Sequence, residues 1–199
     1  MSHEEALVFR KIIQDNKFKS ICELGFYHGK GAVYLGSIVE EQGFGTVTTF
    51  DKKKPWKKEP NIYELIKEFA LEDYINVIET DEGYHWDLYQ IIQDKQLTFD
   101  FCYIDGEHTF ESTALAFYLI DQILEPNGIV VFDDYDWTIE KSLKMNPEKI
   151  KFFPHWLRAT KKQRTSTGVK MVCDNLVIPK GYRQLDIEPK LDWKFFQKI

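Results

Sequence analysis

The chain has 199 residues, of which 43% are hydrophobic and 15% aromatic, and its formal net charge is −6. A chain of this length can bury one substantial core, and no Ser-, Gly- or Pro-rich linker divides it, so we expect a single domain over residues 1–199. The negative charge argues against a protein whose main task is to coat nucleic acid.

Cysteine usage and apolar runs indicate the environment of the protein. Cys22, Cys102 and Cys173 are odd in number, widely spaced and set among apolar residues, which favours reduced core side chains over disulfides or a zinc site. The sequence does not begin with a basic and then apolar leader, and its longest apolar run, 114–120, is too short to span a bilayer. We therefore expect a soluble, cytoplasmic protein without a membrane partner.

Short apolar strands alternate with amphipathic helices over the first two thirds of the chain. Apolar residues at spacings of three and four predict helices near 3–16, 29–42, 62–69, 86–94 and 108–124. Apolar and β-branched runs between them predict strands at 20–24, 46–50, 75–78, 99–104 and 128–132. Parallel strands need long crossovers, so this alternation implies a parallel sheet wound on both faces. The fold class is α/β.

The last third departs from this alternation. Residues 135–167 combine aromatic, Lys and Arg side chains with little periodicity, and we interpret them as a lid or acceptor-site insertion. Val169–Ile178 and Tyr182–Ile187 are predicted to be two strands of an antiparallel hairpin, with the last ten residues docking as a tail. The expected sheet is thus seven-stranded and mostly parallel, with an antiparallel C-terminal hairpin.

A glycine-rich turn follows the first predicted strand. Gly25, Gly29 and Gly31 form a G-x-x-x-G-x-G pattern, and Glu23 lies two residues before the first glycine. Glycines let a ligand approach the backbone, and the amides at the start of the next helix can face polar or anionic groups. This turn is typical of a site for a nucleotide-like cofactor.

Acidic residues follow the next two strands. Asp51 ends the second strand, where it can accept both hydrogen bonds from a ribose diol, and Asp81 and Glu82 follow the third strand, where a base edge would lie. Each acid taken alone can equally end a strand or cap a helix. Together they favour a nucleoside ligand.

Three aspartates follow the fourth and fifth strands. Asp105, Asp133 and Asp134 come from strands expected to be neighbours, and crowded carboxylates with only oxygen ligands favour Mg²⁺ or Ca²⁺. The alternative is that Asp105 caps the next helix while the other two face solvent. Glu107 and His108 lie beside this cluster, and either is a candidate general base for a substrate hydroxyl or a partner of the helix dipole.

These patterns carry a family resemblance over residues 20–135. Glu-Leu-Gly-Phe-Tyr-His-Gly-Lys-Gly at 23–31 resembles motif I of the class I S-adenosylmethionine-dependent methyltransferases. Tyr-Ile-Asp-Gly-Glu-His-Thr-Phe-Glu at 103–111 and Leu-Glu-Pro-Asn-Gly-Ile-Val-Val-Phe-Asp-Asp-Tyr at 124–135 resemble the small-molecule O-methyltransferase branch. That branch includes macrolide and aminocoumarin sugar O-methyltransferases and is related to the catechol type. The resemblance implies a Rossmann-like fold.

The resemblance also implies roles for the residues above. The turn, comprising Glu23, Gly25, Phe26, Tyr27, Gly29 and Gly31, would shape the methionine and ribose pocket. Asp51 would bind the ribose hydroxyls, Asp81 would lie near the adenine, and Glu82 and Asp105 would also bind the cofactor. Asp105 is a candidate catalytic residue as well, together with Glu107 and His108. Asp105, Asp133 and Asp134 would hold Mg²⁺, which would lower the pKa of the acceptor hydroxyl, and Glu107 would match the proposed base of some members.

Two features differ from the family pattern. Lys30 precedes the third glycine, where a small hydroxyl residue is usual. The chain is also short for the sugar-modifying members, so the acceptor pocket is expected to be reduced or shared in a homo-oligomer. Trp137, His155, Trp156 and Arg158 are candidates for an acceptor wall, with packing within a lid as the alternative.

Three other functions compete with this interpretation. A short-chain dehydrogenase would bind NAD(P) through a similar turn, but its Tyr-x-x-x-Lys pair follows strand 5, whereas Tyr63 and Lys67 follow strand 2. A nucleic-acid methyltransferase is supported only by the lysines of 52–58. A protein that binds S-adenosylmethionine without catalysis is the third. The sequence favours a Mg²⁺-assisted O-methyltransferase acting on a small hydroxyl-bearing acceptor.

Overall fold

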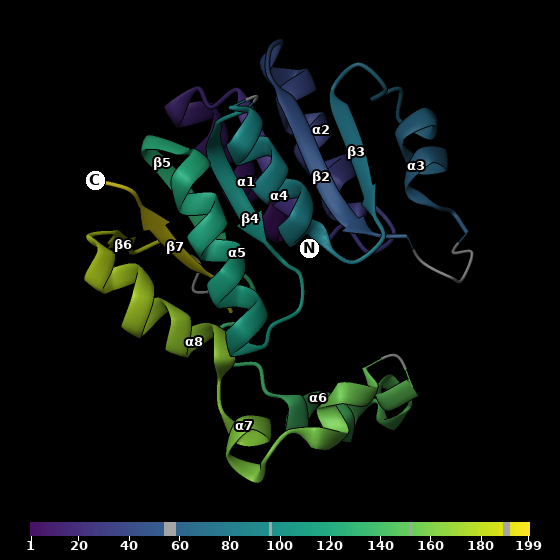
Figure 1. Ribbon diagram of the computed structural model, residues 1–199. Coiled ribbons are helices and arrows are strands. Elements are labelled where there is room, and N and C mark those ends of the chain that lie inside the picture. The colour runs from purple at the N-terminus through teal and green to yellow at the C-terminus, as the bar shows by residue number, and fades with distance from the viewer. Residues whose placement is uncertain (54–58, 96, 152, 189–191) are drawn as a thin grey trace.

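A seven-stranded sheet forms the centre of the computed structural model, which describes residues 1–53, 59–95, 97–151, 153–188 and 192–199 (Figure 1). The strand order is β3-β2-β1-β4-β5-β7-β6. The strands are β1 (Ser20–Leu24), β2 (Thr46–Lys52), β3 (Ile75–Thr80), β4 (Phe99–Ile104), β5 (Leu124–Phe132), β6 (Arg183–Leu185) and β7 (Lys194–Gln197). β1 to β5 are parallel, and β7 is antiparallel to both β5 and β6. The predicted α/β class and mostly parallel sheet are confirmed.

The register of the parallel strands aligns their carboxyl ends. Leu24 at the end of β1 pairs with Phe50 of β2 and with Ile104 of β4, and Ile104 pairs with Phe132 of β5. The residues that follow these four positions therefore meet at one edge of the sheet. This alignment brings together the glycine turn and the acids after β2, β4 and β5.

Helices cover both faces of the sheet. α1 (His3–Asn16), α2 (Lys30–Gln42) and α3 (Ile62–Glu68) share one apolar cluster with the sheet, whereas α4 (Tyr84–Asp94), α5 (Phe110–Ile123) and α8 (Gly168–Val172) share the other. α1 illustrates the sequence basis, because Phe9, Ile12 and Ile13 lie at helical spacing and are buried. Phe9 is fully buried, with its ring centroid 5.0 Å from that of Tyr103.

The predicted strand at Val169–Ile178 is wrong, because this stretch is helical. It forms α8, a turn of π-helix (Cys173–Val177) and a 3₁₀ turn (Ile178–Lys180). Val169, Val172, Cys173 and Val177 are buried, and their spacing of three, one and four residues is that of a helix packed on α5. Tertiary packing at this spacing outweighs the strand preference of the β-branched residues.

The C-terminal residues complete the sheet. β7 lies between β5 and β6, so the antiparallel pair consists of Arg183–Leu185 and the expected tail, rather than of the two predicted segments. Phe195 and Phe196 of β7 are buried on opposite faces of the sheet, one in each apolar cluster. The three cysteines are free and buried, as predicted.

Residues 135–167 form a separate group of short helices beyond the carboxyl edge of the sheet. They are α6 (Ile139–Met145), η1 (Pro147–Lys151), η2 (Pro154–Arg158) and α7 (Lys161–Thr165), at the bottom of Figure 1. The segment ends at Gly168, the first residue of α8, which packs against the start of α5. A Cβ atom on Gly168 would lie 2.6 Å from the Phe110 nitrogen. In the part of the chain that the structure describes, no helix is both long and apolar enough to cross a membrane.

Candidate functional site

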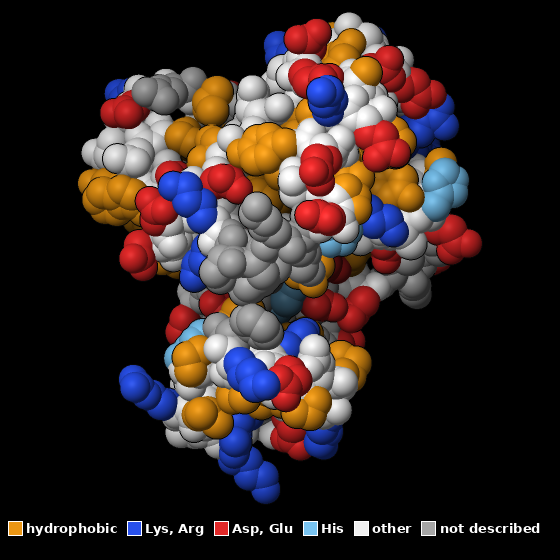
Figure 2. Space-filling view, turned by 90° about the vertical axis from the view of Figure 1, so that its right-hand side faces the viewer, with side chains coloured by type: hydrophobic (Ala, Val, Ile, Leu, Met, Phe, Trp, Pro, Cys, Tyr) orange, Lys and Arg blue, Asp and Glu red, His pale blue; other side chains and the backbone are white. Residues whose placement is uncertain are grey.

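A cavity of about 1460 Å³ opens at the carboxyl edge of the sheet. Its walls come from the turns after β1, β2, β3 and β4 and from residues 135–167. In Figure 2 the surface is hollowed between the sheet above and residues 135–167 below, and acidic and histidine side chains lie in the hollow. This is where a doubly wound sheet binds its ligands.

The glycine turn is shaped by close backbone approaches. Gly25 has φ +100° and donates its N–H to the Phe50 carbonyl at 2.7 Å, while a Cβ atom on it would collide with the Asp105 carbonyl oxygen. A Cβ atom on Gly31 would collide with the Glu23 carboxylate. Both glycines are therefore needed for the turn to pack against β4 and against the buried acid of β1.

Two acids support this turn. Glu23 is 1% exposed and accepts a hydrogen bond from the Thr49 hydroxyl of β2. Asp51 Oδ2 accepts the N–H of Tyr27 at 2.6 Å, which holds Tyr27 at φ +52°. Asp51 thereby connects the turn after β1 to the end of β2, and it lines the cavity.

Tyr84, which is not among the predicted site residues, presents a buried hydroxyl to the cavity. Its hydroxyl has no hydrogen-bond partner among the described residues, although the Ser112 side chain lies nearby. Burial raises the pKa of Tyr84, so the hydroxyl keeps its proton and is available as a donor. The signal in the sequence is a tyrosine placed directly after Gly83, at the end of the acidic turn that follows β3.

The predicted cofactor residues divide into two groups. Those that line the cavity are Gly25, Tyr27, Asp51, Glu82 and Asp105. Glu23, Phe26, Gly29, Gly31 and Asp81 lie outside its lining. Phe26 is buried in the cluster under α1, Gly29 begins α2, and Asp81 is exposed and paired with Lys53 at 3.1 Å.

The three aspartates converge on one tyrosine and one histidine. The Tyr103 hydroxyl lies 3.1 Å from Asp105 Oδ2 and 2.9 Å from Asp133 Oδ2. His108 Nε2 lies 3.3 Å from Asp134 Oδ2 and 3.8 Å from Asp105 Oδ1. Burial, together with the Asp133 charge, holds the pKa of Asp105 well above its usual value, whereas burial lowers the pKa of His108.

The structure does not support the alternative role of Asp105 as a helix cap, since Thr109 caps α5 and its hydroxyl accepts the Ser112 N–H. Within the described residues, no three His, Cys, Asp or Glu side chains are arranged to hold a metal ion. The structure therefore shows that the three aspartates lie close together, but it does not show a metal-binding arrangement.

Glu107 connects the turn after β4 to residues 135–167. Its Oε1 lies 2.9 Å from His155 Nε2 and accepts the Trp156 indole N–H at 3.2 Å. Trp156 also packs on Trp137, with ring centroids 5.5 Å apart. The ring centroid of Trp137 in turn lies 5.6 Å from that of His108. Trp137, His155, Trp156 and Arg158 all line the cavity together with Glu107 and His108, so the four candidates for an acceptor wall border one space, and their role as such a wall stays a prediction.

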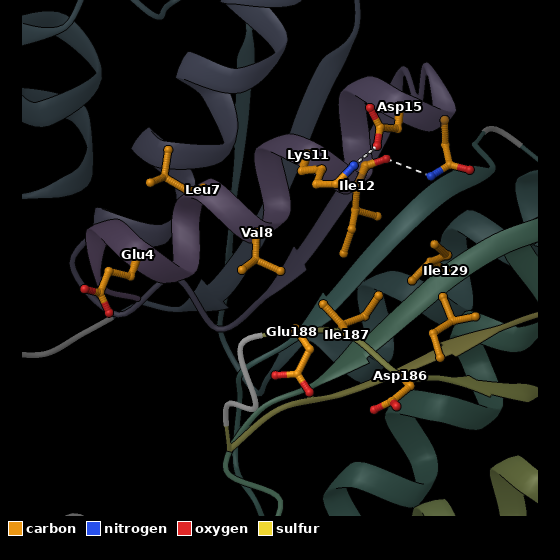
Figure 3. Close-up of a pocket in the computed structure, with 12 residues that line it drawn as sticks. Glu4, Leu7, Val8, Lys11, Ile12, Asp15, Ile129, Asp186, Ile187 and Glu188 are labelled. Carbon is orange, nitrogen blue, oxygen red and sulfur yellow. Dashed lines mark hydrogen bonds and ion pairs between the residues drawn. The ribbon is translucent and has the colours of Figure 1, made fainter.

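A second cavity, of about 860 Å³, lies between α1 and the residues that follow β6 (Figure 3). Its lining is mainly apolar, with Leu7, Val8 and Ile12 from α1 opposite Leu185 and Ile187. None of the predicted site residues borders it. We therefore place the functional site at the carboxyl edge of the sheet.

Solved structures share this fold along nearly the whole chain. A Bacillus cereus O-methyltransferase in complex with S-adenosylhomocysteine matches with a TM-score of 0.66 and 17% identity, over 100% of this chain and 82% of that one. An S-adenosylhomocysteine-bound methyltransferase from Podospora anserina matches with a TM-score of 0.70 and 18% identity, over 100% and 79%. A TDP-rhamnose 3′-O-methyltransferase of calicheamicin biosynthesis matches with a TM-score of 0.66 and 13% identity, over 99% and 80%.

Comparison by sequence finds similarity over a shorter part of the chain than comparison by structure. No curated protein matches the chain by sequence. A family model described as a methyltransferase domain matches residues 22–135, a span that contains the glycine turn and the aspartates after β4 and β5. Since this match covers more than half of the chain, the protein belongs to that methyltransferase-domain family.

Proposed function

We propose that the protein binds S-adenosylmethionine and methylates a hydroxyl group of a small-molecule acceptor. The main support for the proposal is that one cavity is lined both by the glycine turn and Asp51 and by the acids and His108 that follow β4. Residues 135–167 form its opposite wall. Support also comes from solved structures of the same fold, described as O-methyltransferases, that were determined with S-adenosylhomocysteine or S-adenosylmethionine.

The cavity offers groups that suit this cofactor. Asp51 supplies a carboxylate for the ribose hydroxyls, and Tyr84 supplies an unpartnered donor for a polar atom of the adenine or ribose. Glu82 and Glu107 add negative charge around a ligand whose sulfonium is positive. The bound cofactor supplies an electrophilic methyl group, and the residues of the chain position the acceptor hydroxyl against it.

His108 is the better placed of the two candidate bases. Its pKa is lowered by burial, so the imidazole is neutral, and the nearby Asp134 carboxylate can accept the N–H on Nε2. The other ring nitrogen can then accept the proton of the acceptor hydroxyl. Glu107 Oε1 is already engaged by His155 and Trp156, which assigns Glu107 to holding residues 135–167 over the cavity.

The chemistry of the aspartates fits an assisting Mg²⁺ ion. Asp105, Asp133 and Asp134 provide only oxygen donors. The pKa of Asp105 is raised first by burial and then by the Asp133 charge, and a bound cation would relieve the repulsion between the two carboxylates. These three residues would hold the ion, which would supply Lewis acidity toward the acceptor oxygen.

Added Mg²⁺ is expected to raise the melting temperature of the parent protein by a few degrees, about 2–4 °C, since an ion that binds only the folded state stabilises it. In Asp105→Asn and Asp133→Asn this increase should disappear. Thermal unfolding in EDTA and in MgCl₂ measures it, with Asp186→Asn, an exposed acid of the second cavity, as the control. An equal response in all four proteins would contradict the metal proposal.

Asp51→Asn is expected to weaken S-adenosylhomocysteine binding about tenfold to a hundredfold, because it removes a charged hydrogen-bond acceptor. Asp81→Asn should change the affinity less than about twofold, since Asp81 is exposed, paired with Lys53 and absent from the cavity lining. Calorimetric titration of both variants makes the comparison. If Asp81→Asn weakened S-adenosylhomocysteine binding more than about twofold, the result would support the predicted contact between Asp81 and the adenine.

Methyl transfer itself separates an enzyme from a protein that only binds the cofactor. Transfer from labelled S-adenosylmethionine to a panel of phenols, sugars and hydroxy acids, with and without Mg²⁺, should give product with at least one hydroxyl-bearing class. Cofactor binding without transfer to any class would favour the non-catalytic alternative.

A further inference from the structure

Charge is distributed unevenly around the cavity. Residues 135–167 contain eight Lys and Arg but only three Asp and Glu, within a chain whose formal charge is −6. The acids that line the cavity come from the sheet, from the turns after its strands and from the first turn of α5; they are Asp51, Glu82, Asp105, Glu107 and Glu111. Residues 135–167 contribute no Asp or Glu to the lining, and its charged residues from this segment are Lys149, Lys151, Arg158 and Lys162. The other lysines of the lining are Lys52 and Lys53, at the end of β2. Figure 2 shows Lys and Arg side chains gathered on this lower part of the molecule.

Three of these cations have no carboxylate within ion-pair distance among the described residues. They are Lys149, Arg158 and Lys162, from η1, η2 and α7, and all three line the cavity. Lys149 donates to the Ser142 hydroxyl at 2.9 Å. In contrast, Lys144 and Lys151 pair with glutamates of the same segment. Three positive charges that face one cavity without a carboxylate in ion-pair contact favour an anionic ligand.

We propose that the acceptor carries a phosphate or diphosphate group, which Lys149, Arg158 and Lys162 bind while its hydroxyl faces His108. This inference rests on the proposed methyl transfer and adds the chemical class of the acceptor. A cationic cofactor suits the acidic wall formed by the sheet, and an anionic acceptor suits the basic wall opposite. A group with two or more negative charges matches three cations better than a single carboxylate does.

The shape of the site favours a small anion over nucleic acid. The three cations line a cavity instead of an extended surface, and the chain outside residues 135–167 is strongly acidic. A nucleic-acid backbone would meet this acidic surface as soon as it left the cavity. A phosphorylated small molecule places its charge within the cavity alone.

Inorganic pyrophosphate is the probe for this site. Calorimetric titration of the full chain saturated with S-adenosylhomocysteine should give a dissociation constant of about 1 mM or tighter. Arg158→Gln and Lys162→Gln should each weaken binding about tenfold or more, and Arg158→Lys should recover part of the loss. Lys161→Gln is the matched control, because Lys161 neighbours Lys162 on α7 but does not line the cavity.

A second measurement compares three acceptors with the same hydroxyls: a nucleoside diphosphate sugar, the free sugar and the corresponding uronic acid. The first should have the highest kcat/KM, and Arg158→Gln should reduce this preference. Absence of pyrophosphate binding, equal weakening in Lys161→Gln, tighter binding of single-stranded RNA, or preference for the uronic acid would each overturn the proposal. The pyrophosphate titration decides it even if no sugar is methylated, and S-adenosylhomocysteine affinity in the same samples tests the proposed function separately.

Discussion

Gly25→Ala is expected to lower the free energy of unfolding by about 2–4 kcal/mol and to abolish detectable S-adenosylhomocysteine binding. Two costs combine at this position. An alanine must adopt φ +100°, and its Cβ atom would collide with the carbonyl oxygen of Asp105. Relief of the collision requires the turns after β1 and β4 to separate, and these turns form adjoining walls of the cavity. Urea unfolding and calorimetric titration measure the two effects.

Gly43→Ala isolates the backbone cost. Gly43 has φ +81° at the end of α2, and a Cβ atom there would have no neighbour within 4 Å. Its substitution should therefore cost only about 1–2 kcal/mol and leave cofactor binding unchanged. Equal destabilisation by the two substitutions would show that contact with Asp105 does not determine the need for glycine at position 25.

Trp156→Ala is expected to open residues 135–167 locally and to reduce kcat/KM by about a hundredfold. The Trp156 side chain is 3% exposed, stacks on Phe153 at 4.5 Å and donates its indole N–H to Glu107. Burial of a tryptophan in such a cluster stabilises it by about 3–5 kcal/mol, which corresponds to at least a hundredfold faster amide exchange once it is lost. Hydrogen exchange measured by mass spectrometry locates the change.

Leu157→Ala is the control for this variant. Leu157 occupies the next position of η2 but is 69% exposed, so its loss should leave exchange and activity near the parent values. The sheet should unfold at the same urea concentration in both variants, because the ring contacts of Trp156 are with Trp137, Phe153 and His155, and its only bond to the rest of the described structure is the one hydrogen bond to Glu107. A lower urea midpoint in Trp156→Ala alone would mean that residues 135–167 unfold together with the sheet.

The parallel part of the fold is predictable because its signals are local. Each strand from β1 to β5 contains an apolar or β-branched run of suitable length, and each of the helices from α1 to α5 has buried residues at helical spacing. The acids after the strands could be placed at one edge because parallel strands share direction. The resulting convergence of Asp105 and Asp133 on Tyr103 is observed.

The C-terminal region could not be predicted in the same way. β7 has only four residues, and its position depends on pairing with β5, more than sixty residues earlier in the chain. In Val169–Ile178 the β-branched composition and the helical spacing of buried positions conflict, and packing against α5 decides for the helix. Local sequence patterns do not show the pairing of β7 with β5, and in 169–178 they point to strand and helix at once.

Within the site, side-chain partners were the unpredictable part. Tyr84 and Tyr103 lie in ordinary helix and strand sequence, and their importance comes from the hydroxyl environment that folding creates. Glu107 was predicted as a candidate base, but its bonds to His155 and Trp156 cross almost fifty residues of sequence. The sequence indicates which residue types meet at the strand ends, while tertiary contacts determine which of them remain available for chemistry.

The two ends of residues 135–167 lie close together in the structure. The segment departs beside Asp134 and returns at Gly168, and His108 lies against both points. An insertion whose two ends meet at one place adds little closure cost when its length changes, about 0.6 kcal/mol for each doubling. A different segment could therefore replace this one without altering the sheet. If the proposed function holds, such a replacement would change the acceptor and leave the residues proposed to bind the cofactor in place.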